Sequence, residues 1–459
     1  MKQVPKPKSS SIALASVALL FAAALLMGSQ AALGATGGRT LSVAPRGSDA
    51  SLGNESQPWR TLQHAVDQAL PGDTVYVEAG VYPEEVTISR SGRQDASITV
   101  AARPGKAVTV QSLVLKQGVS HINLKDFTVT GYRYWGIKLS GDNHHIHLTG
   151  LKILGGETGV RLTVGDSGQA PQFGPVSYIT IENCQIKGTI YTGVDGTPGP
   201  CDHLTLRRLE VSNAGVKGRE FYGADGIGIE KGQHITVEEC YIHDNGGDGI
   251  DLNSRDQKGR MPGIVVRGNR VVRNHLNGVK LWAGGRLERN AIWGQGETPV
   301  RVGIFHGQAE ISYNTVAYNM WAKDYGGRDY AATIGYPEPE GVGPARPLVD
   351  LVMHHNIFAF NTGPDHGGPT DIYLGPGVNL KEEHDNLFFS RADNEIFLAQ
   401  RGRDEGREIS RENIAAGVWA QLTGHGKGDL AVNPRFVSGW PKVDLHLKPG
   451  SLAKGRGAY

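Results

Sequence analysis

Cysteine is scarce in this 459-residue chain, which has three, Cys184, Cys201 and Cys240. A small, odd number excludes a disulfide framework as the source of stability. An excess of one charge is also absent, since Lys plus Arg is 47 and Asp plus Glu is 46. We therefore expect no nucleic-acid partner. Phe (11) and Met (5) are few while Gly is abundant (64), which indicates many tight turns around thin layers of aliphatic core.

Residues 1–35 have the composition of a signal peptide. Three lysines precede an apolar run at residues 12–27, and small residues suited to cleavage follow. This pattern predicts a secreted protein, either extracellular or periplasmic, with no membrane association of the mature chain. The run is long for a signal peptide, so an uncleaved anchor remains the alternative.

Two short phrases alternate along the chain from about residue 121. One is represented by "HINLKDFTV" at 121 and "YITIENCQI" at 178, the other by "WGIKLS" at 135, "DGIGIE" at 225, "DGIDLN" at 248 and "NGVKLW" at 277. Such short alternating strands, with Gly, Asn or Asp at their corners, cannot bury a face alone but can do so when stacked. The pattern predicts an all-β fold, a single-stranded right-handed parallel β-helix, as one domain over residues 36–459.

The ends of this domain differ from the repeat. "PWRTLQHAVDQALPGDTVYV" predicts a short N-terminal capping helix that ends before Pro71, followed by the first strand. Residues 408–459 are predicted to form a C-terminal cap region, with a helix in "SRENIAAGVWAQLTG" opened by Ser410 and with Glu412 near the capping-box position. Residues 321–347 interrupt the repeat and are predicted to be a long loop insertion.

Stacking of the second phrase brings acidic residues together. Adjacent coils lie about 4.8 Å apart, so Asp225, Asp248 and Asp251 converge, and Lys280 follows one coil later. Three close carboxylates repel one another unless a cation joins them or one takes a proton, and an all-oxygen set suits Ca²⁺. Asn253 and Asp244 are further oxygen donors. The alternative is that Asp and Asn only cap the turns of the coils.

Lys280 lies between apolar neighbours at an outward position. An amine acts as a base only when neutral, and we expect a nearby metal ion and Arg301 to lower its pKa by repulsion of like charge. In a uronic acid polymer, a cation neutralises the carboxylate, the lysine removes the adjacent C5 proton and the O4 leaving group departs by β-elimination. The alternative for Lys280 alone is a solvated surface charge.

The phrases "GADGIGIE", "NGGDGIDLN" and "NGVKLWAGG", in this order after the opening "LSVAPRGSDASLGNESQPWRTLQHAVDQALPGDTVYVEAGVY", resemble the family 9 polysaccharide lyases, which include pectate lyases. The resemblance covers about residues 40–320. It implies a Ca²⁺ site from Asp225, Asp248 and Asp251, with Lys280 as the Brønsted base. The sequence departs from the family at Gly247, where a further aspartate is usual, and this departure puts metal affinity in doubt.

Other residues are candidates for binding a sugar chain. Arg301, His275 and Trp282 are predicted to bind substrate, because each follows or flanks the acidic positions. Further candidates are aromatic, histidine or arginine residues close to the same phrases: Tyr222, Trp293, Trp321, His243, His306, Arg255, Arg270 and Arg273. His145 and His147 alternate onto one face but lack an acidic or cysteine partner at ligand spacing, so we expect no zinc site. Cys184 and Cys240, with Leu209 between them in one inward column, are expected to fill the core.

These patterns favour a secreted, monomeric, Ca²⁺-dependent lyase that cleaves a polyuronate such as pectate. One alternative is an epimerase or a lyase for alginate or a glycosaminoglycan, which removes the same C5 proton. A β-helix glycoside hydrolase would instead use two carboxyl groups as acid and nucleophile or base. A non-catalytic, carbohydrate-binding β-helix at the cell surface would need no lysine beside the aspartates.

Overall fold

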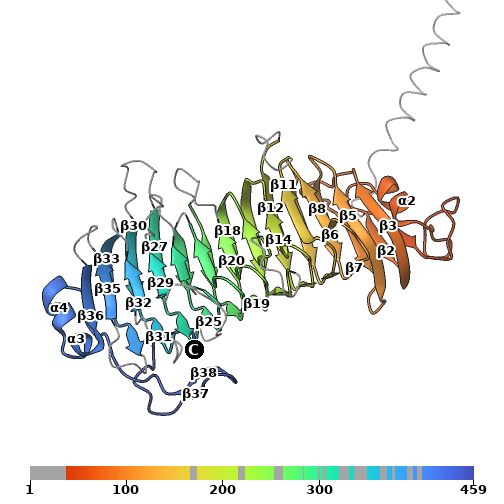
Figure 1. Ribbon diagram of the computed structural model, residues 1–459. Helices are drawn as coiled ribbons and strands as arrows, with labels where there is room; N and C mark the ends of the chain where they lie inside the picture. The colour runs from red at the N-terminus through yellow and green to blue at the C-terminus, as the bar shows by residue number, and fades with distance from the viewer. Residues whose placement is uncertain are drawn as a thin grey trace, which may run out of the picture.

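The computed structural model describes residues 38–459 except 166–172, 216–222, 253–261, 283, 298–299, 303–306, 320–329, 335–348, 362–369, 375–377, 390–395 and 401–405. The chain winds into a parallel β-helix whose strands stack in sequence order from one end of the molecule to the other (Figure 1). The predicted signal peptide lies outside the described residues. No helix in the described part of the chain is long and apolar enough to cross a membrane.

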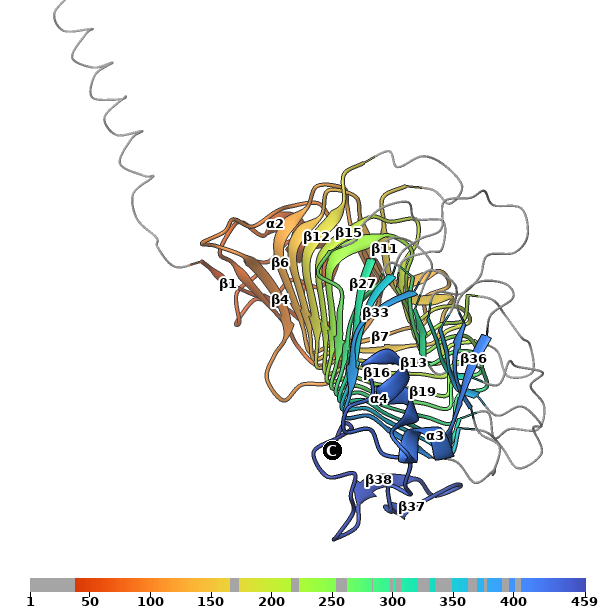
Figure 2. The same ribbon diagram turned by 90° about the vertical axis from the view of Figure 1, so that its left-hand side faces the viewer.

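From residue 120 onward, each described coil contributes one strand to each of three parallel sheets, seen almost end-on in Figure 2. The first sheet contains β1 (Thr40–Val43), β2 (Thr74–Val77), β4 (Ile98–Ala102), β6 (Ser120–Lys125), β9 (His144–Thr149), β12 (Val176–Glu182), β15 (Cys201–Arg207), β18 (Gly232–Glu238), β21 (Val265–Arg267), β24 (Gly285–Glu288), β27 (Gly307–Ser312), β30 (Val349–His354) and β33 (Val378–His384).

The other two sheets are built from shorter strands. The second contains β7 (Thr128–Thr130), β10 (Lys152–Leu154), β13 (Gln185–Lys187), β16 (Glu210–Ser212), β19 (Tyr241–His243), β22 (Arg270–Val272), β25 (Ala291–Trp293), β28 (Thr315–Ala317), β31 (Ile357–Ala359) and β34 (Leu387–Phe389). The third contains β8 (Trp135–Ser140), β11 (Thr158–Thr163), β14 (Val194–Gly196), β17 (Ile227–Ile229), β20 (Ile250–Leu252), β23 (Val279–Leu281), β26 (Val300–Val302), β29 (Tyr330–Ile334), β32 (Thr370–Leu374) and β35 (Ile396–Gln400). The long strands β3 (Gly80–Ile88) and β5 (Val108–Leu115) start both sheets.

The core consists of aliphatic side chains stacked in register. Ile122, Ile146 and Ile179 pair coil to coil, and all three are buried. Each fully buried aliphatic side chain contributes roughly 1.5–3 kcal/mol by leaving water. The three cysteines are buried free thiols, as expected of core residues. Burial raises the pKa of the Cys184 thiol to about 11.

Two ladders of amide side chains continue the core columns toward the C-terminus. Asn269, Asn290, Asn314, Asn356 and Asn386 follow Cys240, and each accepts through Oδ1 from the backbone N–H of the residue one coil earlier. A second ladder is formed by Asn245, Asn274, Gln295, Asn319 and Asn361. These amides satisfy backbone groups at two inward corners where the sheets end.

The N-terminal helix is present as α2 (Leu62–Gln68), capped by the Thr61 side chain, and its Leu62, Ala65 and Val66 are buried against the first coils. The predicted C-terminal helix is instead two short helices, α3 (Arg411–Ala415) and α4 (Val418–Thr423). Gly417 separates them because it adopts a left-handed conformation. Ser410 caps α3 through Asn413, so Asn413 and not Glu412 occupies the capping-box position.

Residues 321–347 are not a loop throughout, because β29 lies within them and pairs with β26 and β32. After β35 the chain reverses into the antiparallel β36 (Gly406–Ser410). The C-terminal segment then adds an antiparallel pair, β37 (Phe436–Ser438) and β38 (Asp444–Leu447), against the outside of the coils (Figures 1 and 2).

Candidate active site

The third sheet brings the predicted outward residues into one column. Gly228 pairs with Asp251, Asp251 with Lys280, and Lys280 with Arg301, on the consecutive strands β17, β20, β23 and β26. The column expected from the repeated phrases is therefore confirmed in its register. The side chain of Arg301 lies outside the described residues.

Asp225 and Asp248 lie just before β17 and β20, where the chain turns from the second sheet to the third. Oδ1 of Asp225 accepts from the backbone N–H of Asp248 at 2.7 Å. One coil later, Oδ1 of Asp248 accepts from both the backbone N–H and the side-chain amide of Asn277, at 2.8 and 2.7 Å. Each acidic side chain is thus fixed by the coil that follows it.

We call Asp225, Asp248 and Asp251 the acidic cluster. One carboxylate oxygen from each lies within 4.8 Å of the others. Burial and the charges of Asp248 and Asp251 hold the pKa of Asp225 well above its usual range. Burial, aided by the charge of Asp248 and opposed by Lys280, raises the pKa of Asp251 to about 6. The surroundings of the acidic cluster therefore do not stabilise three carboxylates that are all ionised.

Lys280 provides the nearest positive charge. Its Nζ donates to Oδ2 of Asp248 at 2.6 Å and to Oδ2 of Asp251 at 2.7 Å. Burial lowers the pKa of Lys280, but the Asp251 and Asp248 carboxylates raise it more, and the net shift is upward. The expected fall in this pKa supposes a metal ion bound by the same carboxylates, and it stays a prediction for that state.

Trp282 lies in the site, yet its ring is only 8 % exposed. Its indole N–H donates to Oδ1 of Asp251 at 2.8 Å, and Nζ of Lys280 lies 5.2 Å from the ring centroid. These contacts support a role in holding Asp251 rather than in stacking on a sugar. His275 is half-buried in the turn before Asn277, on the same corner of the coil, and its role in substrate binding stays a prediction.

Gly247 is the position at which the sequence departs from the resembled lyase family, where a further aspartate is usual. A Cβ at this position would lie 2.4 Å from Oδ1 of Asp225 and 2.9 Å from the carbonyl carbon of Ala224. The backbone of Gly247 also donates to the Ala224 carbonyl at 2.9 Å. The close approach of these two coils therefore excludes any side chain at 247 without a shift of the backbone.

Other acidic residues are engaged elsewhere. Asp244 binds Arg273 at 2.8 and 2.6 Å and His243 at 2.6 Å, so it is not a member of the acidic cluster. Asp195, two coils before Asp251 in the column, is paired with Arg161. Asn253 lies outside the described residues.

Several predicted sugar-binding residues have other contacts. Arg270 lies over the Tyr241 ring at 4.5 Å, and Trp293 is buried. The remaining candidates, Tyr222, Trp321, His306 and Arg255, lie outside the described residues. Among the histidines, His147 pairs with Glu182 at 2.9 Å, while His145 stacks between His121 and Tyr178 on the outside of the first sheet. His121 comes from the preceding coil, so its contact with His145 is not visible in the local sequence spacing.

Comparison with known proteins supports this fold. The model of the Pel9A-like, right handed beta helix region matches residues 41–196, about a third of the chain, and ends before the acidic cluster. The protein YwoF of Bacillus subtilis is 24 % identical over 344 residues, covering 61 % of this chain and 72 % of that protein. Pectate lyase PEL9 of Emericella nidulans is 36 % identical over 70 residues, covering 15 % of this chain and 17 % of that protein.

Solved structures resemble the chain in part. Pectate lyase Pel9A is 14 % identical with a TM-score of 0.39, and covers 91 % of each chain. A family 6 polysaccharide lyase from Pseudopedobacter saltans is 14 % identical with a TM-score of 0.49, and covers 86 % of this chain and 96 % of its own. The family model over residues 41–196 and the stacked parallel strands together make the described chain a right-handed parallel β-helix.

Proposed function

We propose that this protein is a secreted, Ca²⁺-dependent polysaccharide lyase that cleaves a polyuronate by β-elimination. The observation that carries the proposal is the contact of one half-buried lysine with two of three clustered carboxylates. A hydrolase needs the carboxyl groups alone, whereas proton removal from carbon needs a strong base beside them.

The donor set fits a hard divalent cation. Asp225, Asp248 and Asp251 would hold it, because their oxygens lie within 4.8 Å of one another and the nearest cationic group already bridges two of them. When bound, Ca²⁺ supplies positive charge that neutralises the substrate carboxylate and makes the neighbouring C5 proton more acidic. Asn277 and Trp282 keep Asp248 and Asp251 oriented, through the hydrogen bonds described above.

The residues of the chain then have separate tasks. Nζ of Lys280 would lose its proton to solvent once its contacts to Asp248 and Asp251 are replaced by those of the cation. The neutral amine then takes the C5 proton at Nζ, and the electrons of the C–H bond form the C4–C5 double bond as the bond from C4 to O4 breaks. The leaving oxygen collects a proton from solvent. The product is a polymer end with an unsaturated uronate and a new end with a free hydroxyl group, and no water is consumed.

The glycoside hydrolase alternative rests on the three carboxyl groups lying close together, and on the burial that raises the pKa of Asp225, as a general acid requires. One experiment distinguishes the hydrolase from the lyase. The purified protein is incubated with polygalacturonate, alginate and chondroitin, with Ca²⁺ and with a chelator. Ultraviolet absorbance from unsaturated ends that disappears with the chelator supports the lyase. New reducing ends without absorbance would support a hydrolase, and altered sugar configuration without cleavage would support an epimerase.

A further inference from the structure

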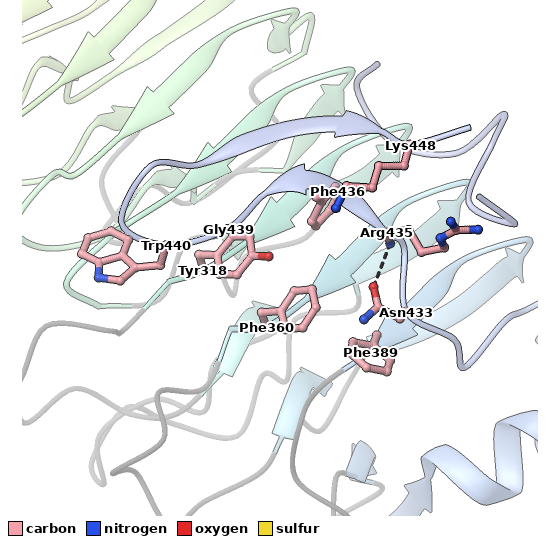
Figure 3. Close-up of a pocket in the computed structure, with 9 residues that line it drawn as sticks. All are labelled: Tyr318, Phe360, Phe389, Asn433, Arg435, Phe436, Gly439, Trp440 and Lys448. Atoms are coloured by element: carbon pink, nitrogen blue, oxygen red, sulfur yellow. Dashed lines mark hydrogen bonds between the residues drawn. The ribbon is translucent and has the colours of Figure 1, made fainter. Parts of the chain in front are cut away.

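A cavity of about 530 Å³ lies away from the acidic cluster, between the coils and the C-terminal pair β37–β38 (Figure 3). Its walls combine aromatic rings from both parts, Tyr318, Phe360 and Phe389 from the coils and Phe436 and Trp440 from the C-terminal segment. We call it the corner cavity. Nothing in the proposed elimination uses these residues.

The corner cavity owes its shape to a stacked column. Tyr318 and Phe360 follow β28 and β31 at equivalent positions, and their rings are parallel with centroids 4.9 Å apart. Gly439 of the C-terminal segment passes directly over Tyr318, where a Cβ would come within 2.7 Å of the tyrosine oxygen. Trp440, which is 39 % exposed, lies at one end of the cavity beside Tyr318 (Figure 3). Tyr318, Phe360 and Phe436 are buried and form the floor, while the exposed Trp440 and the half-buried Phe389 offer apolar faces to the C–H groups of a sugar.

The polar part of the wall is cationic. Arg435 directly precedes β37 and Lys448 directly follows β38, and the backbone N–H of Lys448 donates to the Arg435 carbonyl at 2.9 Å. Within the described parts of the chain, neither side chain has a carboxylate within 4.0 Å, although Arg207, Arg267 and Arg273 on the coils are all paired with acids. Nη1 of Arg435 reaches only the Gly450 carbonyl, at 3.4 Å. The two charges are therefore available to an anion.

An aromatic wall beside two available cations has the chemistry of a site for an acidic sugar. The rings would pack against the sugar face, and the guanidinium would bind its carboxylate. A neutral sugar would leave both charges without a partner, and an inorganic anion would leave the rings unused. The combination favours a uronate unit over either.

We propose that the corner cavity is a second, non-catalytic binding site for a uronate unit of an acidic polysaccharide. The choice of polymer rests on the proposed function. The Tyr318 coil is two coils beyond that of Lys280, about 10 Å along the axis, and Tyr318 lies at the start of the turn from the second sheet to the third. A polymer held there stays close to the acidic cluster and raises its local concentration.

The test measures binding rather than cleavage. Lys280→Ala serves as the parent so that polymer is not cut, and a chelator removes cation-dependent binding at the acidic cluster. Affinity for polygalacturonate and alginate is compared between this parent, the double variant Arg435→Gln/Lys448→Gln and the variant Trp440→Ala. Lys152→Gln/Lys187→Gln removes the same charge from exposed lysines on the second sheet and is the matched control. A neutral galactan reports on the need for charge.

We expect the parent to bind at least one acidic polymer and not the galactan. Arg435→Gln/Lys448→Gln weakens that binding by about tenfold or more, Trp440→Ala by about fivefold, and the matched control by less than about twofold. Circular dichroism and the melting temperature confirm that each variant is folded. Unchanged affinity in folded Arg435→Gln/Lys448→Gln, or no binding of either polymer by the parent, overturns the inference. Binding that depends on Arg435 and Lys448, together with a wild-type protein that yields no unsaturated ends from either polymer, would instead overturn only the proposed elimination.

Discussion

Nζ of Lys280 lies 2.6 Å from Oδ2 of Asp248, so the proposed base is an internal counter-ion of the proposed metal ligands. A cation bound by the acidic cluster and the ammonium of Lys280 compete for the same oxygens. We therefore expect Lys280→Ala to bind Ca²⁺ about tenfold more tightly than the wild type, by calorimetric titration. Lys187→Ala, an exposed lysine on β13, is the control. Weaker Ca²⁺ binding in Lys280→Ala would show that the lysine and the cation do not share these carboxylates.

Ca²⁺ should stabilise the folded protein through the acidic cluster. A ligand that binds only the folded state at about one hundred times its Kd adds about 2.7 kcal/mol to the free energy of unfolding. We expect added Ca²⁺ to raise the melting temperature of the wild type, and not that of Asp225→Asn/Asp248→Asn. Asp244→Asn, which changes the Arg273 pair outside the cluster, should retain the shift. An equal shift in all three proteins would place the cation elsewhere.

Introducing an aspartate at position 247 should not increase the affinity of the acidic cluster for Ca²⁺. A Cβ there meets Asp225 and Ala224 at 2.4 and 2.9 Å, and such overpacking lowers the free energy of unfolding by about 1–3 kcal/mol. We expect Gly247→Ala and Gly247→Asp both to unfold at lower denaturant concentration, and neither to gain Ca²⁺ affinity. At the neighbouring Gly246 the nearest atom to a Cβ is 3.2 Å away, so Gly246→Ala is the milder control. A stable Gly247→Asp with tighter Ca²⁺ binding would contradict this account.

The asparagine ladder should be a strong contributor to stability. Asn314 accepts from the Asn290 backbone through Oδ1, and its amide donates to the Leu287 carbonyl and to Asn356. Asn314→Ala leaves several buried polar groups without partners, each costing about 1–3 kcal/mol. We expect a marked fall in the melting temperature. Asn123→Ala, on the half-buried outer face of β6, removes a single hydrogen bond to Thr99 and should have a small effect. Equal effects would mean that the ladder is not an important source of stability.

At the C-terminal end of this ladder, beside Asn386, lie the carboxyl groups of Glu383 and Asp429. They make the free energy of unfolding depend on pH. Oδ1 of Asp429 accepts from the backbone of Asn386, while burial and the charge of Glu383 raise the pKa of Asp429 to about 9. A raised carboxyl pKa favours the folded state below the ordinary value near 4, and that contribution is lost as pH rises toward 9, by at most about 1.4 kcal/mol per pH unit. Asp429→Asn has no proton to lose. Its melting temperature relative to the wild type should therefore increase between pH 5 and pH 8.5, and a constant difference would contradict the raised pKa of Asp429.

The repeat was predictable because each strand alternates and each coil ends at a similar corner. Alignment of "DGIGIE", "DGIDLN" and "NGVKLW" gives the observed register of Gly228, Asp251 and Lys280. The register of the strands alone does not determine which side chains of neighbouring columns are in contact. The contacts from Lys280 to Asp248 and from Trp282 to Asp251 depend on rotamers and on the turn, and these are not encoded in the period.

Some missed features did leave a signal in the sequence. Asparagine or glutamine recurs five residues after asparagine at 269 and 274, 290 and 295, 314 and 319, and 356 and 361, which is the spacing of the two ladders. The break in the C-terminal helix was less visible, because Gly417 in "AAGVW" is tolerated in many helices and only its left-handed conformation ends α3. The strand β29 was hidden because Tyr330–Ile334 is flanked by glycine-rich and proline-rich sequence.

The central claim is that one amine and one acidic cluster perform a single elimination. The most direct measurement is the rate of ultraviolet absorbance increase on polygalacturonate and alginate, for the wild type and for folded Lys280→Ala, each with saturating Ca²⁺ and with a chelator. We expect a Ca²⁺-dependent rate in the wild type, and a loss of at least about a thousandfold in Lys280→Ala even though its cation site is filled. A Lys280→Ala protein that forms unsaturated ends at the wild-type rate would contradict the account.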